Sequence, residues 1–140
     1  EGERLKADLL SRIETIKTLR EEIASRAPFV AEEYRKKMTE RIRELVGENA
    51  DETRIVTEAA IFSDKCNIDE ELTRLSSHIA EFYSIAEEKL IGRKLDFLIQ
   101  EFNRECNTIC SKSNDSEVTR SALAMKNEIE KIREQIQNIE

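Results

Sequence analysis

Apolar residues recur at intervals of three and four along most of the chain, and no stretch alternates apolar and polar residues as a half-buried strand does. This spacing predicts a helix from about Arg4 to Arg26. We expect Pro28 to end or kink it, with a second helical stretch running to about Val46. Further helices are predicted over 52–65, over 67–88, from 92 to a polar break at 111–116, and from there to near residue 140.

The sequence therefore predicts an all-α fold of five or six helices, with long antiparallel, coiled-coil-like arms around a helical bundle. We divide it into a helical arm (1–46), a central helical region (47–114) and a C-terminal helix (115–140). The apolar stripes are narrow, and such stripes are often completed by another subunit or domain. We accordingly expect the chain to form a homo-oligomer.

Composition agrees with long, soluble helices. Charged residues make up 38% of the 140 residues and aromatic residues 5%, with three glycines and one proline. No apolar run is long enough to cross a bilayer and no signal peptide is visible, so we expect no membrane partner. Three cysteines without a secretory signature favour reduced thiols and a cytoplasmic location.

The net charge of −7 comes from the middle of the chain, where residues 47–91 carry eleven acidic and four basic side chains. A protein that holds a divalent cation beside a polyanion needs acids at the metal and bases at the phosphate. An acidic, solvated surface would have the same composition. Charge alone therefore does not decide between these alternatives.

The stretch 92–112 has an unusual polar side for a helix. Lys94, Glu101, Glu105 and Thr108 form one stripe beside its apolar face. Asp96, Asn103 and Asn107 lie on the other flank, although Asn, Asp and Thr are poor helix formers. We infer that these residues serve a purpose other than helix stability.

This stretch also carries a family resemblance. Together with the blocks 70–78, 111–115 and 129–138, it resembles the C-terminal half of the bacterial YicC/YloC family, and the resemblance covers the whole chain. It implies a cytoplasmic endoribonuclease that acts on RNA, uses a divalent metal (Mn or Mg) and forms a ring-like homo-oligomer, a hexamer being one candidate size. The alternative is a helical oligomerisation or scaffold module, with catalysis in another domain or absent.

Four residues are predicted to bind the metal. Glu71 and His78 lie on one edge of the helix over 67–88, which also carries Arg74, while Glu101 and Glu105 lie one turn apart on the next helix. Helical bundles build di-metal sites from such carboxylates and imidazoles. The alternative is that His78 pairs with a nearby carboxylate at the edge of the core.

The predicted catalytic residues are Glu101, Glu105 and His78. A single histidine excludes RNA cleavage by a pair of imidazoles within one copy, whereas metal-assisted cleavage needs mainly carboxylates. A zinc site combining His78 with Cys66, Cys106 and Cys110 is disfavoured because the usual paired cysteine knuckles are missing. The family resemblance also disfavours it, since that family normally has an aliphatic residue at 106 and glycine at 110.

RNA phosphate is predicted to contact four basic residues around the signature stretch: Arg93, Lys94, Arg104 and Lys112. A second basic group around Tyr34–Lys37, with Arg41 and Arg43, is better explained as a solvated face. No aromatic platform for stacking bases is visible, so the sequence does not indicate that unstacked bases are read.

Overall fold

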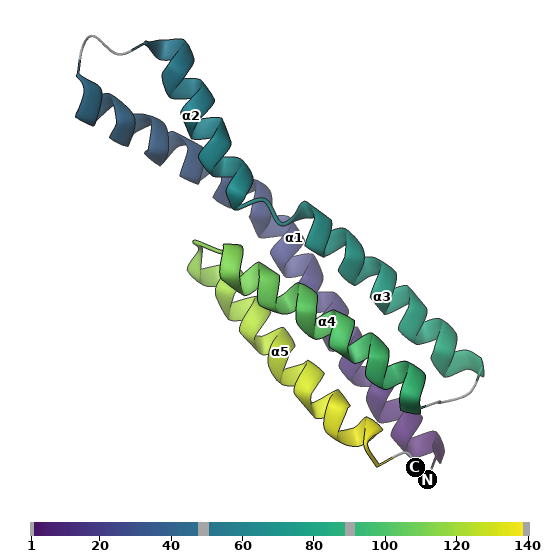
Figure 1. The fold of residues 1–140 in the computed structure, drawn as a ribbon. Coiled ribbons are helices and arrows are strands. Elements are labelled where there is room, and N and C mark those ends of the chain that lie inside the picture. The colour runs from purple at the N-terminus through teal and green to yellow at the C-terminus, as the bar shows by residue number, and fades with distance from the viewer. Residues whose placement is uncertain (1, 48–50, 89–91, 139–140) are drawn as a thin grey trace.

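The computed structural model describes residues 2–47, 51–88 and 92–138. Within these ranges the chain forms helices and no strand, which confirms the predicted all-α fold (Figure 1). The helices are α1 (Gly2–Val46), α2 (Glu52–Lys65), α3 (Asp69–Glu88), α4 (Gly92–Lys112) and α5 (Ser116–Ile136).

The first two predicted helical stretches form one helix, because α1 continues through Pro28 to Val46. A proline inside a helix removes one backbone hydrogen bond and crowds the preceding turn. Here α1 packs against α5 and α3 and also against α2, so tertiary contacts hold the helix together. The expectation that Pro28 ends the helix is therefore wrong.

Four helices form the bundle that contains the main core. Contacts join α1 to α5, α5 to α4, α4 to α3 and α3 back to α1, and the described ends of the chain lie close together at one end (Figure 1). The apolar positions predicted from the spacing face inward. Fully buried side chains include Leu9, Ile13, Leu75, Phe82, Leu95, Phe102, Ile109, Met125 and Ile132.

One ion pair fastens α1 to the start of α5. Asp115 caps α5 by accepting a hydrogen bond from the Val118 N–H at 3.1 Å, and Arg26 donates to the same carboxylate at 3.1 and 3.3 Å. The Arg26 hydrogen bond holds the pKa of Asp115 below its ordinary value. This contribution to stability is therefore present above the unfolded-state pKa and is lost as the pH falls through the lowered pKa of the folded state.

The second half of α1 and α2 project beyond the bundle as a helical hairpin, which we call the arm (Figure 1). Ile55 and Ala59 of α2 are buried, but several large apolar side chains of the arm are exposed. These are Phe29, Leu45, Val46, Val56, Ile61 and Phe62. None of the described helices combines the length and apolar character that a membrane span requires.

Candidate functional site

A row of charged side chains follows the contact between α3 and α4. We call it the charged row, and its members are Glu71, Arg74 and His78 of α3 with Glu105 and Lys112 of α4. The two helices run in opposite directions, so Glu71 lies opposite Lys112 at one end and His78 lies near Glu105 and Phe102. Positions three, four and seven residues apart share one helix face, which explains the alignment.

Glu71 is a buried carboxylate with a partner on the facing helix. Its side chain is only 2% exposed, and Lys112 Nζ lies 2.6 Å from its Oε1. The same ammonium donates to the backbone carbonyl of Asn67 at 3.1 Å. Glu71 Oε2 is buried and accepts no hydrogen bond within the described residues. One acceptor atom of this carboxylate is therefore left for a group that the described protein does not supply.

Glu105 is the second buried carboxylate, and Arg74 is its partner. Arg74 Nε donates to Glu105 Oε2 at 2.6 Å, and a guanidinium nitrogen of Arg74 lies 3.9 Å from Glu71 Oε1. The pKa of Arg74 is raised, first because of its hydrogen bond to Glu105. Arg74 thus links the two carboxylates while about half of its side chain remains exposed.

His78 lies at the edge of this pair. Its Nε2 is 3.9 Å from Glu105 Oε2, which is too long for a hydrogen bond, and it is buried without a partner in the described residues. The ring packs edge-on against Phe102, with 5.7 Å between the ring centroids. Phe102 therefore fixes one side of the imidazole while its nitrogen remains available.

The predicted residues separate into two groups. The structure brings together Glu71, His78, Glu105 and Lys112. Glu101 is half-buried one turn before Glu105, and its side chain makes no hydrogen bond or ion pair with the described residues. Three predicted phosphate ligands are exposed and likewise unpaired, namely Arg93, Lys94 and Arg104. Helical spacing places Lys94 on the stripe of Glu105 and Lys112 and turns the two arginines outward.

Arg74 is the functional candidate that sequence reasoning left without a role. It lies on the predicted edge between Glu71 and His78, so its position could be read from the sequence. Its bond to Glu105 could not, because that contact depends on how α3 and α4 are aligned. A basic residue between acids on one helix edge was the available signal.

A metal ion does not fit the charged row as this chain builds it. The described residues contain no group of three or more His, Cys, Asp or Glu side chains placed to hold a metal. Arg74 and Lys112 already balance the charge of the two carboxylates. Cys106 is fully buried, donates to the Ala122 carbonyl, and has its pKa raised by burial to about 12, which makes it a poor metal ligand.

Fold and site together define a helical domain with a partly buried acid–base cluster along one helix pair. The family described as "Endoribonuclease YicC-like, C-terminal" matches residues 23–140. The chain therefore belongs to the YicC-like endoribonuclease family, in agreement with the resemblance seen in its sequence.

Two curated relatives are similar to the whole chain. A "Probable endoribonuclease YicC" of Clostridioides difficile (strain 630) is 48% identical, the match covering 100% of this chain and 49% of that protein. A protein of the same name from Haemophilus influenzae is 37% identical, with the same coverage. The chain thus spans about half the length of the curated relatives it matches.

Removing the ammonium partner of Glu71 should destabilise the fold. Lys112→Met leaves a buried carboxylate without its cation, and we expect a loss of about 3 kcal/mol in the free energy of unfolding, measured by urea denaturation at pH 7. The double variant Glu71→Gln/Lys112→Met should recover at least ~1 kcal/mol of that loss.

Lys94→Met is the matched control, because Lys94 lies on the same stripe of α4 but is exposed and unpaired. We expect it to change stability by less than about 0.5 kcal/mol. Equal effects of the Lys94 and Lys112 substitutions would contradict the pairing.

Proposed function

We propose that this chain forms part of an endoribonuclease that cleaves RNA phosphodiester bonds, and that the charged row lies at the reaction site. Family membership supports the class of activity. The observation that carries the location is the buried, unpartnered Nε2 of His78 beside the Arg74–Glu105 pair. Perturbed acid–base groups of this kind concentrate at functional sites.

His78 is the group suited to move a proton. A neutral imidazole accepts a proton and an imidazolium donates one near neutral pH, and Glu105 lies close enough to favour the charged form during the reaction. Only one histidine is present, so one copy of the chain supplies one imidazole. Glu101, half-buried and unpaired one turn away, is the candidate for the second proton-transfer group.

Arg74 is suited to contact the phosphate. It spends one guanidinium donor on Glu105 and is about half exposed, so donors remain for non-bridging phosphate oxygens. Lys94, Arg93 and Arg104 extend the positive charge along α4. We infer that RNA lies along α4 and is held chiefly through its backbone.

Dependence on a divalent cation, Mn or Mg, remains a prediction. Because the charged row is already neutral without one, such an ion needs ligands from the RNA or from residues outside this arrangement. No step proposed here passes through it. Cleavage measured with each metal and with a chelator tests the dependence directly.

A second role, self-association, is favoured by the arm. Exposed contiguous apolar surface commonly marks an interface, and the arm exposes Leu45, Val46 and Val56 by more than half. We propose that copies of the chain form a homo-oligomer through the arm. We also place the protein in the cytoplasm, where its three free thiols remain reduced.

Substitutions in the charged row should reduce cleavage without loss of the fold. In the complete protein, His78→Gln, Glu101→Gln and Glu105→Gln should each slow single-turnover RNA cleavage about a hundredfold, because each removes a proton-transfer group or its support. Asp96→Asn on the opposite flank of α4 should leave the rate within about twofold, since Asp96 contacts only Gln100.

Melting temperature and sedimentation of the same variants separate a chemical effect from unfolding. Normal cleavage by all three variants would place the reaction site elsewhere, outside the charged row.

Phosphate contact along α4 predicts a change in salt dependence. Lys94→Gln and Arg104→Gln should each weaken binding of unrelated single-stranded RNAs equally. Each should also lower the slope of log affinity against log salt by about 0.7. Lys131→Gln, an exposed lysine of α5, should leave the slope unchanged. A loss confined to one RNA sequence would show that the two residues read bases.

Self-association predicts species larger than 16.3 kDa in sedimentation velocity at micromolar concentration. Leu45→Glu with Val56→Glu should shift the distribution toward the monomer, because each places a charge on the exposed apolar surface. A clean monomer for the unmodified protein across the concentration range would refute the proposal.

A further inference from the structure

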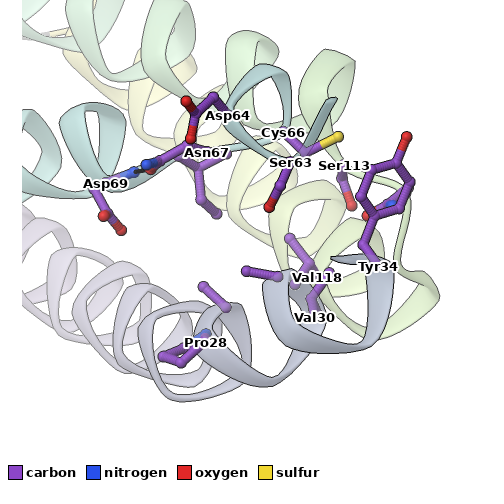
Figure 2. A pocket seen from close by; sticks show the side chains of 14 residues that line it. Pro28, Val30, Tyr34, Ser63, Asp64, Cys66, Asn67, Asp69, Ser113 and Val118 are labelled. Carbon is purple, nitrogen blue, oxygen red and sulfur yellow. Dashed lines mark hydrogen bonds between the residues drawn. The ribbon is translucent and has the colours of Figure 1, made fainter. Parts of the chain in front are cut away.

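A cavity of about 230 Å³ lies where the arm meets the bundle, and nothing in the charged row uses it (Figure 2). Its walls come from the middle of α1, from the segment joining α2 to α3, and from the loop between α4 and α5. Drug-sized ligands usually occupy roughly 300–1,000 Å³, so this cavity suits a single ring system.

The lining combines apolar walls with unpaired polar groups. Val30, Ile68 and Val118 supply aliphatic surface, and the half-buried Tyr34 supplies an aromatic ring (Figure 2). The side chains of Ser63 and Asn114 make no hydrogen bond with the described part of the chain. Apolar faces with hydrogen-bonding groups at the edge are what a planar heterocycle requires.

The charge of the lining separates a base from a phosphate. Asp64 and Asp69 line the cavity, and no Lys or Arg does. A phosphate inside it would meet like charge, whereas a base with an amino group could donate to a carboxylate. The nearest assigned cation is Lys112, which bonds to the carbonyl of the lining residue Asn67 and directly precedes Ser113.

The cavity is continuous with the charged row. Asn67 stands one helical turn before Glu71, and His78 lies eleven residues beyond Asn67, or ~16 Å along the helix axis. A strand whose phosphates follow Lys112 and Arg74 therefore passes the mouth of the cavity within a few nucleotides of His78.

We propose that this cavity holds one unstacked nucleobase of the RNA bound along the charged row, with its face on Tyr34 and its edge toward Ser63, Asn114 and Asp64. The proposal rests on the proposed RNA cleavage. It revises the expectation that unstacked bases are not read, because Tyr34 belongs to a cavity that only the fold assembles. Bases that carry an amino group fit the acidic lining better than uracil.

The test combines one change in the protein with one change in the RNA. An eight-nucleotide RNA is scanned with a single abasic position, and binding is measured in a chelator with RNA integrity checked by gel. One abasic position should weaken binding to the unmodified protein about five- to a hundredfold. Tyr34→Leu should weaken the intact RNA by a similar factor and bind the abasic RNA as the unmodified protein does.

Two further variants guard against a trivial loss of structure. Ala31→Met narrows the cavity from an exposed position on α1 and should reproduce the effect of Tyr34→Leu, while Ser25→Met on the same helix, outside the cavity, should bind normally. Independent, additive effects of the protein and RNA changes would overturn the base-binding proposal. So would a shift in sedimentation with no effect of any abasic position, because it would assign the cavity to a protein segment.

Thiol labelling locates the base without measuring affinity. In a Cys110→Ser background, Cys66 in the cavity wall is the accessible thiol, since Cys106 is buried and its pKa is raised to about 12. Intact RNA should slow alkylation of Cys66 and the critical abasic RNA should not. Equal protection by both RNAs would exclude a base from the cavity, whereas failure of every RNA to bind would also remove the proposed function.

Discussion

Two carboxylates buried between α3 and α4 set the main constraint on this structure. Glu71 and Glu105 are only 2% and 3% exposed, and a buried charge is tolerated only when paired. Each is paired across the helix contact rather than along its own helix, by Lys112 and Arg74. These pairs fix how far one helix can slide along the other. The same register sets His78 beside Glu105, so helix alignment and site geometry have one cause.

The pairing also explains why acidity in the middle of the chain does not by itself indicate a metal. Seen as composition, residues 47–91 carry a large excess of acids. In the fold, the two deepest acids are neutralised by protein cations, one of which comes from outside that segment. The remaining acids of this region are mostly exposed. Local charge balance, not the sum over a segment, decides what a site can bind.

Much of the fold follows from the sequence because helical periodicity is a local property. The spacing of Leu72, Leu75 and Ile79, for example, identifies the buried face of α3 without any knowledge of its neighbours. The continuity of α1 through Pro28 was missed because α2 and α5 stabilise it from a distance. Within the site, the helix edge carrying Glu71 and His78 was predictable. The bond from Arg74 to Glu105 and the cavity around Tyr34 were not, since both depend on side chains far apart in the sequence.

The unbroken α1 has a mechanical consequence. Because one backbone runs from the bundle core into the arm, the arm acts as a lever whose fulcrum is near Pro28, where a helical hydrogen bond is missing. The eighteen residues from there to Val46 make this lever ~27 Å long, so a bend of about 5° at the fulcrum displaces the tip by ~2 Å. Whatever grips the tip thereby exerts torque on the wall that carries Pro28, Val30 and Tyr34.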